Sequence, residues 1–161
     1  SASVLIRQWD ILNQSAGGLA LKRGGGSDGV SIAVGEVVGV RFDPTQPWAI
    51  GAVRWVYSDD VQGLQFGLQM LAPSAQLVTV RHAHGQTSTR KLPGLRLPEL
   101  PTMRRPATLL VPHGAYSETD FIVDSTEGSM RVRAGKLIEQ TLAFDAFAFQ
   151  PHQAAVELTP R

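Results

Sequence analysis

The segment Asn13-Gln14-Ser15-Ala16-Gly17-Gly18 lies between two apolar runs and carries the side chains best suited to recognising a small ligand. Short asparagine and serine side chains at the end of a strand can exchange hydrogen bonds with the edge of a flat ring while also bonding to their own backbone. The two glycines permit positive φ and let such a ring lie close to the chain. The segment therefore predicts either a binding turn or an Asx-type turn without a ligand.

Three histidines are candidate metal ligands. His82 and His84 would lie on one face of a strand, and His113 would have to come from elsewhere in the fold. Zinc is bound by neutral imidazoles that converge tetrahedrally, so three histidines would suffice. The first two stand beside Gly85-Gln86-Thr87-Ser88, which favours a solvated loop, and we expect no metal site.

Other motifs that could support catalysis lack the surroundings that they need. Gly24, Gly26 and Gly29 fit GxGxxG, but a dinucleotide fingerprint must open a helix, and β-type sequence follows here, which favours a hairpin loop. Asp59 and Asp60 adjoin each other between two strand-like runs, so we expect turn residues rather than paired catalytic carboxylates. No Ser, His and Asp arrangement has recognisable local context. We therefore expect no enzymatic activity.

The charge distribution argues against nucleic acid and membrane as partners. The formal net charge is +1, and no apolar run approaches the ~20 residues that a membrane helix requires. One cluster of basic residues alternates with leucines, which favours a solvated connection over a phosphate site or an acidic-partner site. Its members are Arg90, Lys91, Arg96, Arg104 and Arg105. Since the chain has no cysteine, a reducing compartment fits, and we expect a cytoplasmic location.

Apolar and polar residues alternate with a period of two in short segments, whereas helical periodicity is nearly missing, so we expect a mostly β protein. The clearest segment is 63–71, where the apolar side chains share one face. The same alternation predicts Val53, Trp55 and Tyr57 on one face. Together with the runs at 4–12, 18–21 and 38–42, these segments give about five or six strands, enough to close a small barrel.

The prolines predict where one domain ends and the next begins. Residues 91–106 contain four prolines, which do not fit a central strand, so this stretch is predicted to be an extended connection between a domain at 1–90 and a second β-rich domain at 107–161. In the second domain Met130, Val132 and Ala134 oppose two arginines, as in an amphipathic strand. The chain begins Ser1-Ala2-Ser3 rather than with methionine, so we expect a part of a longer protein.

The opening segment, with Asn13-x-Ser15-x-x-Gly18, resembles the [D/N]xSxxG signature of PilZ domains, small β-barrels that receive the bacterial messenger cyclic di-GMP. Three further stretches fall in PilZ order and rough spacing, and the resemblance covers residues 3–72. They are Val34-Gly35-Glu36-Val37-Val38, Gly51-Ala52-Val53-Arg54-Trp55-Val56 and Gly63-Leu64-Gln65-Phe66-Gly67. The resemblance implies a six-stranded antiparallel barrel, followed here by a second small β-domain.

The resemblance also assigns ligand contacts. It implies that Asn13, Ser15 and Gly18 contact a guanine of cyclic di-GMP, and Gly17 and Arg7 are further candidate ligand-binding residues. Ligand-binding PilZ domains also carry RxxxR upstream, whose two guanidinium groups clamp phosphate and stack on guanine. No two arginines four apart occur in the 161 residues, and Arg7, within the first strand-like run, is the only arginine before the motif. Either the clamp precedes this sequence or the domain does without it.

The resemblance thus implies a non-enzymatic bacterial regulatory module in cyclic di-GMP signalling or motility and pilus control, which contacts a protein partner. Because the clamp is missing, we expect these residues alone to bind cyclic di-GMP weakly or not at all. The alternative is a structural or protein-interaction β-domain of a larger assembly that has no nucleotide ligand. No cofactor is expected other than cyclic di-GMP as a possible ligand.

Overall fold

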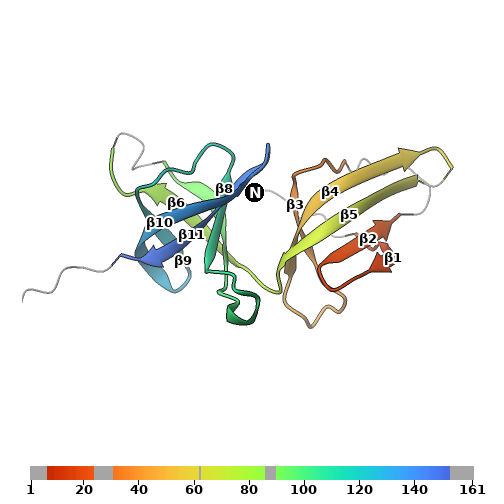
Figure 1. Cartoon of the computed structure of the whole chain (residues 1–161), viewed down its shortest axis with the longest axis horizontal. Helices are drawn as coiled ribbons and strands as arrows, with labels where there is room; N and C mark the ends of the chain where they lie inside the picture. Colours follow the sequence, from red (N-terminus) through yellow and green to blue (C-terminus); the bar gives the residue numbers. More distant parts are fainter. Residues whose placement is uncertain (1–6, 24–30, 62, 86–89, 153–161) are drawn as a thin grey trace, which may run out of the picture. The chain divides into compact units, whose positions relative to one another are not determined.

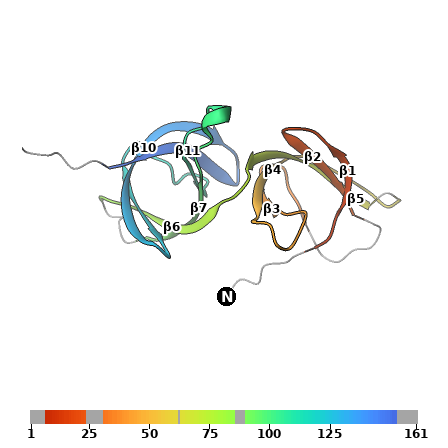
Figure 2. The same cartoon turned by 90° about the horizontal axis from the view of Figure 1, so that it is seen from below.

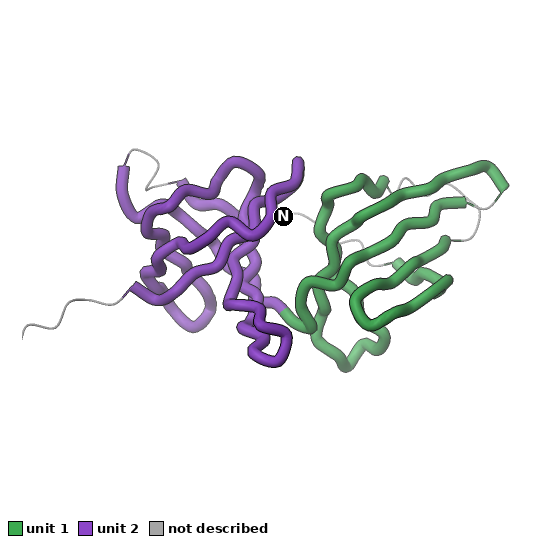
Figure 3. Tube along the Cα trace, viewed as in Figure 1, with its two compact units in different colours: residues 1–74 green, residues 75–161 purple. Residues whose placement is uncertain are grey.

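The computed structural model describes residues 7–23, 31–61, 63–85 and 90–152, and almost all of its regular structure is β-strand (Figure 1). The predicted mostly β class is confirmed. The chain divides into two compact units, residues 1–74 and residues 75–161 (Figure 3). Among the described residues, no helix is long and apolar enough to cross a membrane.

The first unit contains one antiparallel sheet in the order β1-β2-β5-β4-β3. Its strands are β1 (Asp10–Gln14), β2 (Gly18–Lys22), β3 (Val37–Val40), β4 (Ala49–Asp59) and β5 (Gly63–Ala72). The predicted alternation along β5 is confirmed, because Phe66 and Leu68 are buried while Gln69 is exposed. The two buried side chains pack with Leu19 and Leu21 of β2 in the core of this unit.

From Trp55 onward, the side chains of β4 lie on the opposite faces of the sheet from those predicted. Alternation predicted Val53, Trp55 and Tyr57 on one face, but the pairing with β5 shifts between Val53 and Trp55. Val53 and Val56 therefore both enter the core, whereas Trp55 and Tyr57 are 43% and 51% exposed. One extra residue, Arg54, forms a β-bulge, and such an insertion reverses the facing of every residue that follows. The prediction was wrong from Trp55 onward, and the outer face of the sheet gains two aromatic side chains.

The second unit is a closed antiparallel barrel in the order β10-β11-β8-β7-β6-β9, which Figure 2 shows as a ring of strands. Its strands are β6 (Gln76–His82), β7 (Leu92–Leu97), β8 (Thr108–Pro112), β9 (Asp120–Ser125), β10 (Gly128–Gln140) and β11 (Phe144–Pro151), with a short 3₁₀ helix η1 (Pro101–Met103) between β7 and β8. Pairing of β9 with β10 closes the ring. The six-stranded closed barrel predicted for the first domain is thus found in the second, while the described residues of the first form a five-stranded open sheet.

The division between units lies at residues 74 and 75 rather than at the predicted connection 91–106. That stretch contains β7, which pairs with both β6 and β8. A proline fits here because Pro93 pairs with Thr79 on β6, whereas pairing with β8 begins only at Leu95. The missing N–H of Pro93 therefore lies outside the β7–β8 pairing. The segment before β7 supplies β6, which belongs to the barrel of the second unit.

Strand β11 is buried on both faces at its start. Phe147 and Phe149 pack inside the barrel with buried residues of β6, β8, β9 and β10. Phe144 lies on the opposite phase and is also buried, so the start of this strand is covered on both faces. On β10, Val132 is buried while Arg131 and Arg133 are exposed, which confirms the amphipathic strand predicted there.

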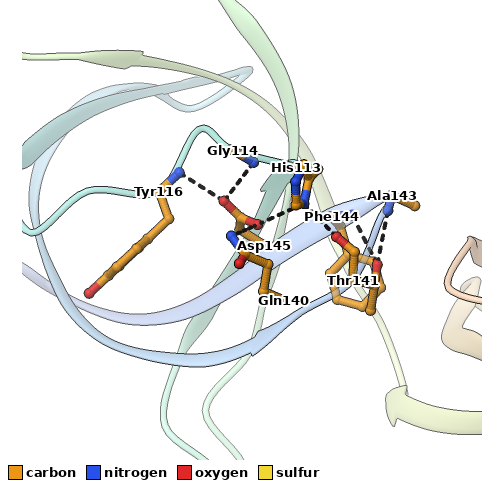
Figure 4. A network of polar contacts seen from close by, with 8 residues as sticks. All are labelled: His113, Gly114, Tyr116, Gln140, Thr141, Ala143, Phe144 and Asp145. Carbon is orange, nitrogen blue, oxygen red and sulfur yellow. Dashed lines mark hydrogen bonds and ion pairs between the residues drawn. The ribbon is translucent and has the colours of Figure 1, made fainter.

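A buried carboxylate fastens the loop after β8 to the barrel wall (Figure 4). Asp145 of β11 is 0% exposed, and its Oδ2 accepts the backbone N–H groups of Gly114 and Tyr116 at 2.9 and 3.0 Å. Its Oδ1 accepts the Gln140 side-chain amide at 2.8 Å, and His113 Nδ1 lies 3.7 Å from the same oxygen. The contacts satisfy a charge that would otherwise be costly to bury, so this network is structural.

Candidate functional site

An open hollow of about 240 Å³ lies on the outer face of the first sheet. Its lining residues come from β1, β2, β4, β5 and the β1–β2 turn. They are Asn13, Ser15, Gly18, Leu19, Ala20, Trp55, Gly67 and Leu68. Three residues singled out from the sequence, Asn13, Ser15 and Gly18, thus line one cavity.

Strand pairing explains how residues far apart in sequence meet here. Asn13 on β1 pairs with Ala20 on β2. Ala20 in turn pairs with Gly67 on β5, whose other partner is Trp55 on β4. Directly paired residues in antiparallel strands share a face, and three strand spacings make this row about 14 Å long. Its two ends carry a polar amide and an indole, and its middle carries only a methyl group and a glycine.

The β1–β2 turn holds Ser15 at the rim of the hollow. The Ser15 backbone N–H donates to the Gly18 carbonyl at 2.9 Å, which closes the turn. The backbone N–H of Met70 on β5 donates to the Gly17 carbonyl at 3.0 Å and ties the turn to the sheet. Asn13 and Ser15 are both exposed, so the turn presents an amide and a hydroxyl to solvent beside the small residues of the floor.

The two glycines of this turn differ in their surroundings, and neither provides a positive φ. Neither Gly17 nor Gly18 has left-handed φ, which corrects the expectation drawn from the sequence. A Cβ on Gly18 would lie 3.3 Å from Ser15 Oγ and 3.4 Å from the Leu68 carbonyl oxygen. A Cβ on Gly17 would meet nothing within 4 Å. Of the two turn glycines, only Gly18 therefore has close neighbours, and a Cβ there would need the Ser15 side chain to move slightly.

Trp55 forms the far wall of the hollow, and we did not single it out from the sequence as a site residue. A Cβ on Gly67 would overlap the pyrrole half of its indole, so the ring lies directly on the glycine. Tryptophan would normally be assigned to the core, and the bulge at Arg54 turns it outward. The available signal was the glycine at an outward-facing position of β5, since a glycine inside a strand marks close approach by another group.

Two other predicted ligand residues lie apart from the hollow. Arg7 precedes β1 instead of lying within the strand, and it is exposed. Neither Arg7 nor Gly17 contributes to the lining. Gly24, Gly26 and Gly29, which formally fit GxGxxG, lie outside the described residues.

The histidines make separate contacts in the second unit. The His82 ring packs on Phe121 with centroids 4.5 Å apart, and His84 Nε2 accepts a hydrogen bond from Arg131 at 2.7 Å. His113 belongs instead to the Asp145 network. Over the described ranges, no group of three or more His, Cys, Asp or Glu residues could hold a metal ion.

The expected turn at Asp59 is confirmed. Its Oδ1 accepts the Val61 backbone N–H at 2.9 Å, and its Oδ2 accepts the Tyr57 hydroxyl at 3.0 Å. The bond to this carboxylate favours the protonated phenol, so the pKa of Tyr57 is raised above its usual 10.0. The aspartate therefore shapes the end of β4 on the same face as Trp55.

Both units match families of known proteins. Residues 2–76 match the family model of the cyclic-di-GMP receptor FimW, middle PilZ domain, and residues 77–152 match that of the FimW C-terminal beta-barrel domain. The cyclic-di-GMP receptor FimW of Pseudomonas aeruginosa is 32% identical over 124 residues. These residues are 75% of this chain but only 20% of that relative, and no solved structure matches. Residues 2–76 therefore belong to the PilZ domain family, as the motif indicated, and are followed by a β-barrel domain of the FimW C-terminal family.

Proposed function

We propose that this chain is a non-enzymatic receptor module for cyclic di-GMP and that the hollow of the first sheet holds one guanine base. The observation that carries the proposal is the row from Asn13 to Trp55, in which Ala20 lies next to the amide and Gly67 lies beneath the indole. A polar edge, a floor of small residues and an aromatic wall are what a flat, hydrogen-bonding ring requires. The name of the similar receptor supports the same ligand.

The chemistry of the rim suits guanine. Guanine offers both acceptors, O6 and N7, and donors such as its 2-amino group. The Asn13 amide and the Ser15 hydroxyl can each donate and accept, so together they can satisfy a mixed edge. Trp55 contributes a flat apolar surface, and contact between a base and an aromatic ring contributes about 1–3 kcal/mol. Recognition in the hollow then depends on the base rather than on bulk charge.

The phosphates are the part of the ligand that is hardest to bind without charged side chains. No RxxxR pair occurs in these 161 residues, so the charge-assisted contacts of a two-arginine clamp are not supplied by this sequence. We expect weak or undetectable binding by the chain alone and tighter binding once upstream residues supply such a clamp. The proposed setting is cyclic di-GMP signalling in the cytoplasm, with control of motility or pili through a protein partner.

Calorimetric titration of the native full-length protein with cyclic di-GMP and with cyclic di-AMP tests this function. Adenine has no O6 acceptor and no 2-amino donor, so it is a matched control for base recognition. We expect binding of cyclic di-GMP with at least tenfold preference over cyclic di-AMP. Equal affinity for both dinucleotides would contradict a guanine-reading site.

A second function follows from the missing clamp. If the native protein has no RxxxR upstream of Asn13, the first sheet would act as a protein-interaction domain in a larger assembly without nucleotide. Reading about thirty residues of native sequence before Ser1 separates the two functions, because the clamp precedes the motif in ligand-binding members of the family. Lack of RxxxR together with lack of heat of binding would favour the interaction domain.

A further inference from the structure

Arg54 stands beside the hollow because of the bulge in β4. The inserted residue leaves Val53 and Val56 in the core, so the segment between them, Arg54 and Trp55, turns away from it. Arg54 Nε donates a hydrogen bond to Gln69 Oε1 at 2.8 Å, and Gln69 is an exposed residue of β5. The guanidinium is thus held on the outer face of the sheet.

The position of Gln69 fixes where that guanidinium lies relative to the hollow. Gln69 pairs with Gly18, a lining residue at the end of the β1–β2 turn. Along β5 it follows Gly67 by two residues, which is about 7 Å on the same face. The cation therefore adjoins the turn end of the hollow, where Ser15 also lies.

We infer that Arg54 binds a phosphate of the dinucleotide whose guanine occupies the hollow and that Gln69 positions its guanidinium. The inference rests on the proposed function and adds a phosphate contact from inside the sheet to any clamp supplied upstream. A planar guanidinium is weakly hydrated and presents several N–H donors in a fixed fork that matches phosphate oxygens. The bond from Nε to Gln69 restricts the side chain and lowers the entropy lost when it meets phosphate.

Other cations of the first unit have contacts that lead elsewhere. Arg41 lies over the Trp48 ring at 4.1 Å, and Arg23 lies over Trp9 at 5.8 Å. Lys22 shares the outer face with the hollow, and its strand partner on β1 is the acidic residue Asp10. Lys22 is therefore a matched control, since its removal takes the same charge from the same face.

The test compares Arg54→Gln with Lys22→Gln by NMR titration of the 161-residue chain. Two probes are used: cyclic di-GMP, and guanosine, which has no phosphate. We expect Arg54→Gln to weaken cyclic di-GMP binding about tenfold or more, as loss of a charge-assisted hydrogen bond does, with guanosine shifts unchanged. Lys22→Gln is expected to change neither ligand by more than about twofold.

Two further variants separate charge from geometry. Arg54→Lys keeps the charge but not the fork, so it should recover only part of the affinity. Gln69→Glu is isosteric and places a carboxylate beside the phosphate, so it should weaken cyclic di-GMP binding and spare guanosine. Unfolding curves show whether each variant keeps the wild-type fold.

The outcomes distinguish this inference from the proposed function. Wild-type affinity for cyclic di-GMP in Arg54→Gln, with guanosine still bound, would overturn the role of Arg54 and leave the base site standing. An equal loss of both ligands in that variant would make Arg54 a structural residue and would also overturn the inference. Lack of binding of either ligand at millimolar concentration, to the wild-type chain and also to the native full-length protein, would overturn the base site and, with it, the role of Arg54.

Discussion

The indole of Trp55 lies directly on Gly67 of the neighbouring strand, at a point where any side chain on residue 67 would overlap the ring. This contact defines the far wall of the hollow that Asn13 and Ser15 border on the near side. It depends on two features of the sequence, a bulge at Arg54 that turns the tryptophan outward and a glycine that leaves room beneath it. The site is therefore a product of the sheet as much as of the motif that marks it.

Replacing Gly67 with alanine should displace Trp55. The new Cβ would lie inside the indole, so the ring must move, and we expect a loss of roughly 1–2 kcal/mol in unfolding free energy. The ring should become more exposed, and cyclic di-GMP binding should weaken at least several-fold. Tryptophan fluorescence and urea unfolding measure the first two effects. Gly17→Ala is the control, because its Cβ meets nothing within 4 Å, and similar results for both variants would refute the steric explanation.

Ser15→Ala should weaken cyclic di-GMP binding by the native full-length protein. The hydroxyl at the rim is removed while the backbone bond from Ser15 to Gly18 is retained, so the turn should persist. A neutral hydrogen bond contributes about 0.5–1.5 kcal/mol, which corresponds to a loss of about two- to tenfold. Calorimetry of both proteins gives the ratio, and unchanged affinity would mean that Ser15 does not contact the base.

Asp145→Ala should strongly destabilise the barrel of the second unit. Two backbone N–H groups and the Gln140 amide would lose their buried acceptor, and we expect a cost of at least about 3 kcal/mol. Far-UV circular dichroism during unfolding measures this loss of stability. All tryptophans lie in residues 1–74, so their fluorescence reports on the first unit separately. Asp60→Ala, an exposed turn position, is the control, and equal stability of the two variants would contradict the role given to Asp145.

The charge on Asp120 should contribute to stability above acidic pH. A hydrogen bond from Arg131 Nε at 2.8 Å lowers the pKa of Asp120 below its usual 3.8, with smaller contributions from the charges of His152 and Arg133. Since the pKa is lowered in the folded state, the stabilisation is fully present above the unfolded value and disappears as pH falls through the folded one.

Arg131→Gln should therefore raise the pKa of Asp120 toward 3.8 and reduce stability at neutral pH, with the difference from wild type shrinking below about pH 4. Carboxyl carbon NMR shifts follow the titration directly. Arg133→Gln should change it less, because Arg133 acts only through its charge at longer range. An Asp120 titration that is the same in wild type and Arg131→Gln would rule out the hydrogen bond as the cause.

Much of the fold could be predicted because alternation records which face of a strand is buried. Phe66, Leu68 and Gln69 of β5 and residues 130–134 of β10 follow this pattern. The domain boundary could not be placed, because prolines were taken as breaks, whereas Pro93 lies at the end of a strand where its missing N–H is tolerated. Which unit closes into a barrel depends on long-range pairing that no local pattern records.

The side of the hollow formed by Asn13 and Ser15 could be predicted from the sequence, and the side formed by Trp55 could not. Asn13 and Ser15 are marked by a short motif, since they lie together in one turn. Trp55 and Gly67 come from different strands, and their contact requires the β4–β5 register and the bulge at Arg54. A bulge leaves no regular signal in a strand, so alternation assigned the tryptophan to the wrong face.

The central claim is that the hollow between Asn13, Ser15 and Trp55 holds a guanine of cyclic di-GMP. The most direct measurement is a titration of the isotope-labelled 161-residue chain with cyclic di-GMP, followed by NMR chemical shifts. We expect concentration-dependent shifts for the backbone amides of residues 13–20 and for the Trp55 indole N–H, with the Trp48 indole unchanged. Shifts confined to the barrel of the second unit, or ligand-dependent shifts that leave residues 13–20 and the Trp55 indole unchanged, would contradict this claim.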